Sequence, residues 1–337
     1  MRTLVVSDFH LGARLGNDVL RRPEPLARLL AALDAVDRLV LLGDVVELME
    51  GRHQRALELA EPVLRAIGRR LGPDRAVTIV PGNHDAPLVR RWVRAQGRSL
   101  TPTEVVPIDA SETLGRVASW LAPARVDVSY PGVWLSDRVW ATHGHYLDRH
   151  LFPVSAYGVR RGLFGGLPET TATPLDYELA RRPSVSRLSG SVPLPVAALL
   201  NDLAELARAA TMPRIRRGLL KPTFAPWTAA LLGLQMRRAS MPALARVVHR
   251  LGIEADWVVF GHVHRLGPLP DDDPLAWAGP GGRPRLANCG SWLYEPLLVH
   301  RATPPQPYWP GGAVLIEDGA DPRAIGLLDD LGPDELH

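Results

Sequence analysis

Short apolar runs alternate with segments of helical spacing along the first 145 residues. The runs are four to six residues long and rich in valine, leucine and threonine, which favours strands. The segments between them repeat leucine and alanine every three or four positions, which favours helices. Strands that alternate with helices are typical of βαβ units around a parallel sheet. We expect strands at 3–7, 38–42, 76–80, 125–130, 132–135 and 138–142, and helices at 25–33 and 55–71.

This alternation stops between residues 147 and about 245, where prolines and glycines accumulate. Helical fragments, such as those at 196–210 and 241–251, are expected there. The apolar runs return afterwards, and we expect further strands at 256–260, 285–288, 297–300 and 313–317.

The change of pattern predicts the domain organisation. We expect an α/β (or α+β) core made of residues 1–146 and 253–317. A mainly helical insertion at 147–252, a lid or cap, splits this core. An acidic tail, partly frayed, follows at 318–337.

Composition narrows the class of protein. The chain of 337 residues is 46% hydrophobic and 22% charged, which is ordinary for a globular protein and excludes a disordered chain. Its one cysteine, Cys289, excludes an internal disulfide. The N-terminal apolar run is too short for a secretory signal, and no stretch is long enough to span a membrane, so we expect a cytoplasmic protein. The net charge of +3 argues against nucleic acid as a partner.

Five short segments with metal-binding residue types each follow an expected strand. Side chains at the carboxyl ends of strands in an open α/β sheet meet in one crevice. Residues two apart in an extended segment point the same way, and we expect glycines 43, 82, 144 and 261 to turn the chain sharply off each strand. The segments are Asp8-Phe9-His10, Gly43-Asp44-Val45-Val46-Glu47, Gly82-Asn83-His84-Asp85, His143-Gly144-His145 and Gly261-His262-Val263-His264.

Alone, each segment is also compatible with an ordinary turn, a capped loop or a histidine in the core. Together they supply imidazole, carboxylate and amide groups without thiolate, which suit manganese, iron, zinc or nickel. They are too many for one tetrahedral ion and match two ions that share a bridging carboxylate, as in two-metal hydrolases.

In their residues and order, these segments resemble the calcineurin-like metallophosphoesterases. The resemblance implies a four-layer β-sandwich flanked by helices, with a dinuclear metal site at its edge. It implies that one ion is held by Asp8, His10 and His264, that the other is held by Asn83, His143 and His262, and that Asp44 bridges the two.

The same resemblance implies the chemistry. We expect a dinuclear metal-dependent phosphoester hydrolase, a phosphodiesterase or pyrophosphatase, in which a metal-bound hydroxide attacks phosphorus. His84 contacts the phosphate and protonates the leaving oxygen as general acid. Asp85 orients His84 or its loop, and Glu47 also supports the site rather than binding metal. Manganese is the expected metal, and iron, zinc and nickel suit the same ligands.

Within this family the chain is most similar to the UDP-2,3-diacylglucosamine hydrolases, through residues 7–12, 43–48, 260–265 and 288–292. That branch implies a lipid-precursor pyrophosphatase. The chain departs from it at His84, where the branch usually has arginine, and at His145, where it usually has aspartate. The fold is also compatible with a DNA nuclease and with a scaffold without catalysis. The small net charge disfavours the nuclease, and the complete set of ligands disfavours the scaffold.

The insertion bears on the substrate. Residues 213–238 place an apolar stretch between basic clusters. This pattern fits a lid that covers an apolar tail, an anchor on anionic lipid at the inner face of the membrane, or a plain helical subdomain. We therefore expect a phosphoester small molecule or a lipid-linked substrate as partner. No heptad pattern predicts an oligomeric state.

Overall fold

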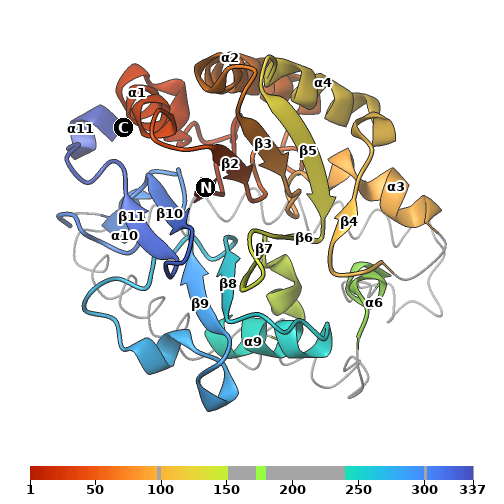
Figure 1. Cartoon of the computed structure of the whole chain (residues 1–337). Helices are drawn as coiled ribbons and strands as arrows, with labels where there is room; N and C mark the ends of the chain where they lie inside the picture. Colours follow the sequence, from red (N-terminus) through yellow and green to blue (C-terminus); the bar gives the residue numbers. More distant parts are fainter. Residues whose placement is uncertain (97–99, 151–171, 180–239, 300–301, 337) are drawn as a thin grey trace, which may run out of the picture.

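The computed structural model describes residues 1–96, 100–150, 172–179, 240–299 and 302–336. The strands of these residues form two sheets, as Figure 1 shows. The first sheet has the order β11-β10-β1-β2-β3-β5-β4, and the second has the order β6-β7-β8-β9. The strands are β1 (Arg2–Val6), β2 (Arg38–Leu41), β3 (Ala76–Ile79), β4 (Glu104–Val105), β5 (Arg125–Tyr130), β6 (Gly132–Trp134), β7 (Val139–Thr142), β8 (Trp257–Phe260), β9 (Arg285–Asn288), β10 (Gly312–Glu317) and β11 (Arg323–Gly326).

Helices cover the outer face of each sheet. Figure 1 shows α1, α2 and α4 over the first sheet and α9 under the second. Together with the two sheets they make four layers, which confirms the expected sandwich flanked by helices. The helices are α1 (Pro23–Leu33), α2 (His53–Leu71), α3 (Arg90–Ala95), α4 (Glu112–Trp120), α6 (Pro174–Leu179), α9 (Met241–Arg250), α10 (Pro296–Val299) and α11 (Pro333–Leu336).

The central strands are apolar on both faces because both faces are buried. In β1, Leu4 and Val6 pack toward the helices, whereas Val5 packs toward the second sheet. Strands β1, β2, β3 and β5 run parallel, and so do β7, β8 and β9. Parallel strands that are covered on both sides have continuous apolar sequences rather than alternating ones, which is why the apolar runs predicted these strands.

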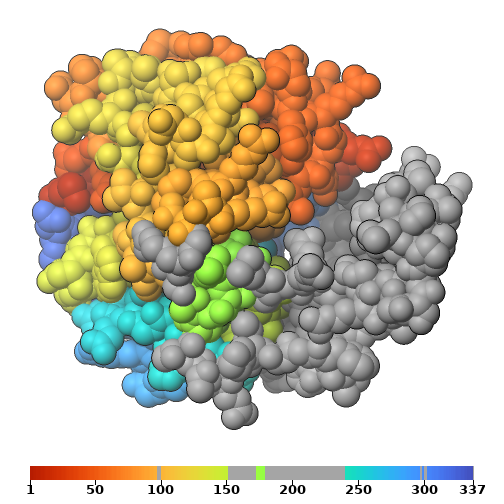
Figure 2. Space-filling view, turned by 90° about the vertical axis from the view of Figure 1, so that its right-hand side faces the viewer, coloured from red at the N-terminus to blue at the C-terminus, as the bar shows by residue number. Residues whose placement is uncertain are grey.

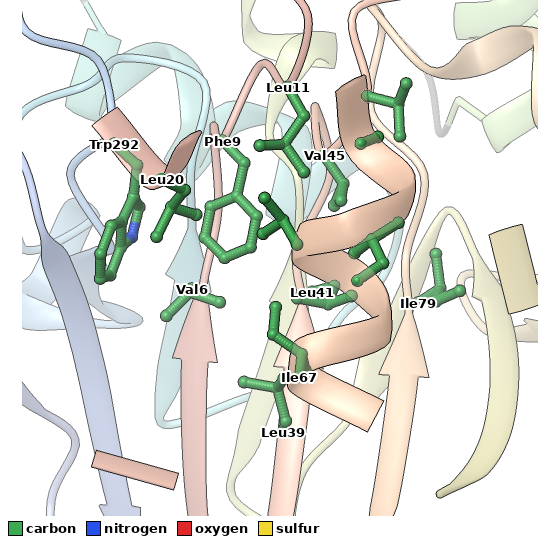
Figure 3. Packing of buried hydrophobic residues seen from close by; sticks show 14 of the residues in the cluster. Val6, Phe9, Leu11, Leu20, Leu39, Leu41, Val45, Ile67, Ile79 and Trp292 are labelled. Atoms are coloured by element: carbon green, nitrogen blue, oxygen red, sulfur yellow. The ribbon is translucent and has the colours of Figure 1, made fainter. Parts of the chain in front are cut away.

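The core continues past the ends of the strands. Figure 3 shows Phe9 and Leu11, which follow β1, in the same apolar layer as Ile67 of α2. The Phe9 ring also meets the Trp292 ring edge to face, with 5.5 Å between centroids. Every second side chain of this loop is therefore anchored in the core, and the residues between them are held in place.

One expected strand is wrong. Residues 296–299 form the short helix α10, which begins at Pro296. Proline is favoured in the first turn of a helix, where its missing N–H has no bond to make. The apolar run at 297–300 reflects a helix that packs on the first core through Val299.

Two boundaries also differ from the expectation. Helix α9 packs on the second sheet through Leu244 and Val248, so residues 241–252 belong to the outer layer of the core rather than to the insertion. The acidic tail contributes β11, which pairs with β10 and extends the first sheet. The expected helix at 196–210 and the apolar stretch at 213–238 lie outside the described residues. No helix in the described part of the chain is long and apolar enough to cross a bilayer.

The role of the tail can be tested at Leu328, which is fully buried and packs against Gly311. The Leu328→Ala variant should lower the free energy of unfolding by about 2–5 kcal/mol, because it leaves a cavity in the core. Denaturant unfolding measures this change. The matched control, Leu275→Ala, removes a side chain that is 78% exposed and should cost less than about 0.5 kcal/mol. Equal, small effects would mean that the tail is not part of the core.

Candidate metal centre

The five polar segments meet at the carboxyl ends of strands from both sheets. Asp8 and His10 follow β1, Asp44 follows β2, and Asn83 and His84 follow β3 in the first sheet. The segments that begin at His143 and Gly261 follow β7 and β8 in the second sheet. The two sheets therefore contribute opposite walls of one site.

A shared backbone conformation marks the ligand positions. Among the described residues, five non-glycine residues have a positive φ, between 45° and 67°. This left-handed conformation costs an ordinary residue of order 1–3 kcal/mol, so such residues gather where a site requires them. All five were predicted from the sequence as metal ligands: Asp8, His10, Asp44, His262 and His264.

Asp8 and His10 do not face the same way through the pleat of an extended segment, contrary to the expectation. These residues do not lie in a pleated extended segment, because β1 ends at Val6 and both residues are left-handed. Their side chains still reach the same place, with His10 Nε2 3.8 Å from Asp8 Oδ1. The two side chains meet because Asp8 and His10 each have a left-handed backbone, while Phe9 between them is anchored in the core.

Two of the four glycines also act differently from the expectation. Gly43 and Gly144 have positive φ, as a sharp turn requires. Gly82 and Gly261 do not; a Cβ at Gly82 would overlap the Asp44 carboxylate, and one at Gly261 would meet Asp8 Oδ2 at 2.6 Å. These two glycines are needed because ligand side chains lie directly against them.

The first group of candidate ligands is Asp8, His10 and His264, whose donor atoms lie within 4.8 Å of one another. Asp8 Oδ2 accepts hydrogen bonds from Ser7 Oγ at 2.5 Å and from the backbone N–H of His262 at 2.9 Å. These bonds fix the carboxylate and direct Oδ1 toward His264 Nε2, 3.2 Å away.

The second group is Asp44, His143 and His262, which meets the same 4.8 Å limit. Asp44 Oδ2 lies 3.1 Å from His143 Nε2 and 3.8 Å from His10 Nε2, a member of the first group. His143 Nε2 is also 3.2 Å from Asn83 Oδ1. All seven predicted ligands are thus brought together, in the two sets expected, with Asp44 between them.

Buried polar atoms without partners show that this donor set fits metal ions. Asp8 Oδ1 and His10 Nε2 are fully enclosed and have no hydrogen-bond partner among the described residues. An unsatisfied buried polar atom is costly, so each one calls for a ligand. A lone pair on a carboxylate oxygen and one on an imidazole nitrogen, facing the same space, suit a cation.

Three of the four imidazoles are oriented by a hydrogen bond at one ring nitrogen. His143 Nδ1 donates to the backbone carbonyl of Leu42 at 2.9 Å. His10 Nδ1 donates to Glu47 Oε2 at 3.0 Å, and His262 Nε2 donates to Asp148 Oδ1 at 3.0 Å. Such partners fix the tautomer and leave the opposite nitrogen free for a metal. His10 and His143 therefore present Nε2, and His262 presents Nδ1.

Glu47 connects a ligand to the predicted acid. Its Oε2 accepts a second bond, from His84 Nδ1 at 2.6 Å, while Oε1 accepts from the backbone N–H groups of Met49 and Glu50. His84 is also close enough to His10 and Asp44 to form a third candidate metal group. The position of His84 therefore allows two roles, general acid or ligand.

Asp85 connects two of the loops that carry site residues. Its carboxylate is fully buried and accepts from the backbone N–H groups of Val45, at 2.9 Å, and Gly82, at 2.5 Å. Asp85 thereby ties the loop after β2 to the loop after β3. Of the two ways in which Asp85 was expected to act, the structure has the contact with the loop, and Glu47 is the carboxylate on the His84 ring. Asp85 is therefore a positioning residue.

The pKa values of the site residues are shifted by the charged groups that lie close to them. Burial alone would lower the pKa of His10, but its interaction with Asp8, its hydrogen bond to Glu47 and the charge of Asp44 outweigh burial and raise the value to about 10. The pKa of His143 is raised to about 9 against the effect of burial, chiefly by the charge of Asp44. Conversely, burial would raise the pKa of Asp44, and the two histidines lower it. Because a metal takes the lone pair that a proton would occupy, metal and protons compete here.

Two residues at the rim of the site were missed from the sequence. Asp148 lies in the 3-10 helix η4 (His145–Arg149), one turn after His143. A polar residue on the turn that follows a ligand is a signal that could have pointed to it. Glu178 of α6 lies 3.8 Å from His145 Nε2, and no pattern in its own segment indicates that position.

Comparison with known proteins agrees with this geometry. Residues 1–167 match the family model of the calcineurin-like phosphoesterases. These residues, just under half of the chain, are similar to that family. The chain is a metal-dependent phosphoesterase. His262 and His264 lie outside the matched residues. They follow β8 of the second sheet and lie beside Asp8 and Asp44, which are within the match.

Matches to individual proteins are distant. No curated protein matches the chain significantly. One solved structure that matches is a dimetal phosphatase from Danio rerio, with 14% identity, a TM-score of 0.35, and coverage of 97% of this chain and 99% of that one. At this identity and TM-score, the match says nothing about the site of this chain.

Gly261 provides a test of the close packing in the phosphoesterase site. The Gly261→Ala variant should weaken metal binding about tenfold or more, because the new Cβ displaces Asp8 and Ser7. Titration calorimetry with manganese measures the affinity. Gly115→Ala is the control, since the nearest atom to its Cβ is 3.8 Å away. Unchanged affinity in Gly261→Ala would contradict the proposed packing.

Asp148 provides a test of imidazole orientation. In Asp148→Asn the amide can donate to His262 Nε2, which moves the ring proton to Nδ1 and blocks the metal-binding atom. We expect the ion held by His262 to bind about 10–100-fold more weakly. The exposed Asp137→Asn makes the same charge change away from the site and should leave both affinities unchanged. If Asp148→Asn binds both ions normally, Asp148 does not orient His262.

Proposed function

We propose that this chain is a dinuclear phosphoester hydrolase that cleaves phosphodiesters or pyrophosphates, with His84 as general acid. The observation that carries the proposal is the position of Asp44, whose Oδ2 lies between His10 of one ligand group and His143 of the other. A single carboxylate shared by two groups is the arrangement of two-metal hydrolases. Manganese is the proposed ion, and iron, zinc and nickel suit the same imidazole, carboxylate and amide donors.

When bound, the two ions supply Lewis acidity at the phosphate oxygens and lower the pKa of a coordinated water. The protein supplies the rest. Asp8 and Asp44 provide negative charge that attracts the ions, and Asp85 fixes the loops that carry Asp44 and His84. The insertion lies close by, since α6 packs at the rim of the site. This supports a substrate with a group to be covered, as in a diester.

His84 holds the proton that the leaving oxygen needs. Because Glu47 accepts the proton on Nδ1, Nε2 is the atom that can transfer one. Burial would lower the pKa of His84, but the hydrogen bond to Glu47 and the charge of Asp44 raise it. The direction of this shift favours the imidazolium form, which is the form that a general acid requires.

The proposed acid can be distinguished from a third metal ligand by the leaving group. His84→Ala should slow cleavage of diphenyl phosphate about 10²–10⁴-fold, because phenolate leaves poorly without a proton. Cleavage of bis-para-nitrophenyl phosphate should fall much less, because nitrophenolate leaves readily unprotonated. Both rates are measured with metal-stripped protein after the metal is restored.

The control is His53→Ala, which changes an exposed histidine at the start of α2 and should not affect either rate. The His84→Ala protein should still bind two ions. An equal loss on both substrates would argue against proton transfer by His84, and loss of an ion would make it a ligand.

A further inference from the structure

A small pocket lies beside the metal centre and has no role in the mechanism above. Its volume is about 100 Å³. One wall is the predicted metal ligand Asn83, four residues of η4 form another, and Tyr177 and Glu178 of α6 close it. Because Asn83 belongs to both the pocket and the metal centre, a group attached to a phosphate at the ions can enter the pocket.

The α6 wall is held firmly against the core. Glu178 Oε1 accepts hydrogen bonds from the hydroxyls of Tyr130 and Tyr146, the latter at 2.7 Å. The Tyr177 ring stacks on Tyr146, with 4.7 Å between centroids and 6° between planes. Figure 2 shows residues 172–179, in bright green, lying on this face below the orange segment that contains α3.

The pocket offers more hydrogen-bond acceptors than donors. Tyr146 gives its proton to Glu178, so its oxygen can only accept further bonds. His145 Nδ1 is fully enclosed and has no partner in the described part of the chain, while its Nε2 faces the Glu178 carboxylate. With the proton on Nε2, Nδ1 presents a lone pair.

The charges that line the pocket also favour a ligand that donates hydrogen bonds. Two carboxylates, Asp148 and Glu178, line it together with one guanidinium, that of Arg149. This excess of negative charge disfavours a second phosphate in the pocket. An apolar group is also disfavoured, because it would cover the Asp148 and Glu178 carboxylates without making a hydrogen bond to them.

We propose that this pocket is the subsite for the alcohol portion of the phosphoester and that it takes a small group rich in hydrogen-bond donors, a hydroxyl or an ammonium. Glu178 is its specificity-determining residue, and His145 lies against the Glu178 carboxylate through Nε2. The inference rests on the proposed function, since the ions hold the phosphate to which the group is attached.

The experiment compares phosphomonoesters that differ only in donors, as competitors of bis-para-nitrophenyl phosphate cleavage by the full-length, manganese-loaded protein. Glycerol phosphate is paired with propyl phosphate, and phosphoethanolamine with ethyl phosphate. We expect the donor-bearing member of at least one pair to inhibit about tenfold more strongly, because it gains a hydrogen bond to a carboxylate. The pair that differs identifies hydroxyl or ammonium as the preferred donor.

Variants assign this preference to the pocket. In Glu178→Gln the ratio of inhibition constants should fall toward one, with folding checked by circular dichroism. Asp176→Asn removes the same charge from an exposed position of α6 and should keep both the ratio and the cleavage rate. Equal inhibition within both pairs for the unaltered protein, or an unchanged ratio in a folded Glu178→Gln protein, would overturn the inference.

Failure of the proposed function would look different. If no phosphodiester is cleaved with any metal, the hydrolase proposal fails. The same pairs can then be compared by calorimetric binding to the metal-loaded protein, where equal affinities would overturn the pocket inference as well.

Discussion

Two carboxylates, those of Asp8 and Asp44, are buried between the ends of the two sheets, with exposed fractions of 0% and 1%. Burial of a charge costs several kcal/mol unless opposite charge and hydrogen bonds compensate it. Part of the compensation comes from backbone N–H groups and from imidazoles. Asp8 Oδ1 and His10 Nε2 still lack a hydrogen-bond partner among the described residues, and a cation would satisfy both atoms. The rest of the site, with its oriented histidines and crowded glycines, is arranged around these charges.

Stability and function are coupled in the same short segments. In the loop after β1, Phe9 packs against Trp292, while the residues on either side of it face the metal centre. The backbone N–H of Trp292 also bonds to the carbonyl of Asp8 at 3.0 Å. Packing energy from the core thus maintains the strained left-handed conformation of Asp8 and His10. This explains how a site made of loops can be held in a fixed geometry.

Much of this could be predicted from the sequence because its signals are local. Central strands buried on both faces are continuous apolar runs, and the ligands follow them directly. The run at 297–300 was misread as a strand because short apolar runs are ambiguous without tertiary context. Contacts between distant segments, such as Glu178 with Tyr130, leave no local pattern. Left-handed turns at Asp8 and His10 were missed for the same reason, since the core imposes them.

The central claim is that Asp44 joins two ions into one catalytic centre. The most direct measurement is the metal content of the full-length protein, with metal-restored cleavage of bis-para-nitrophenyl phosphate, for the unaltered chain and for Asp44→Asn. The account predicts two ions per chain and turnover in the unaltered protein, and loss of at least one ion together with turnover in the variant. Failure of the unaltered protein to bind metal, or full activity of Asp44→Asn, would contradict it.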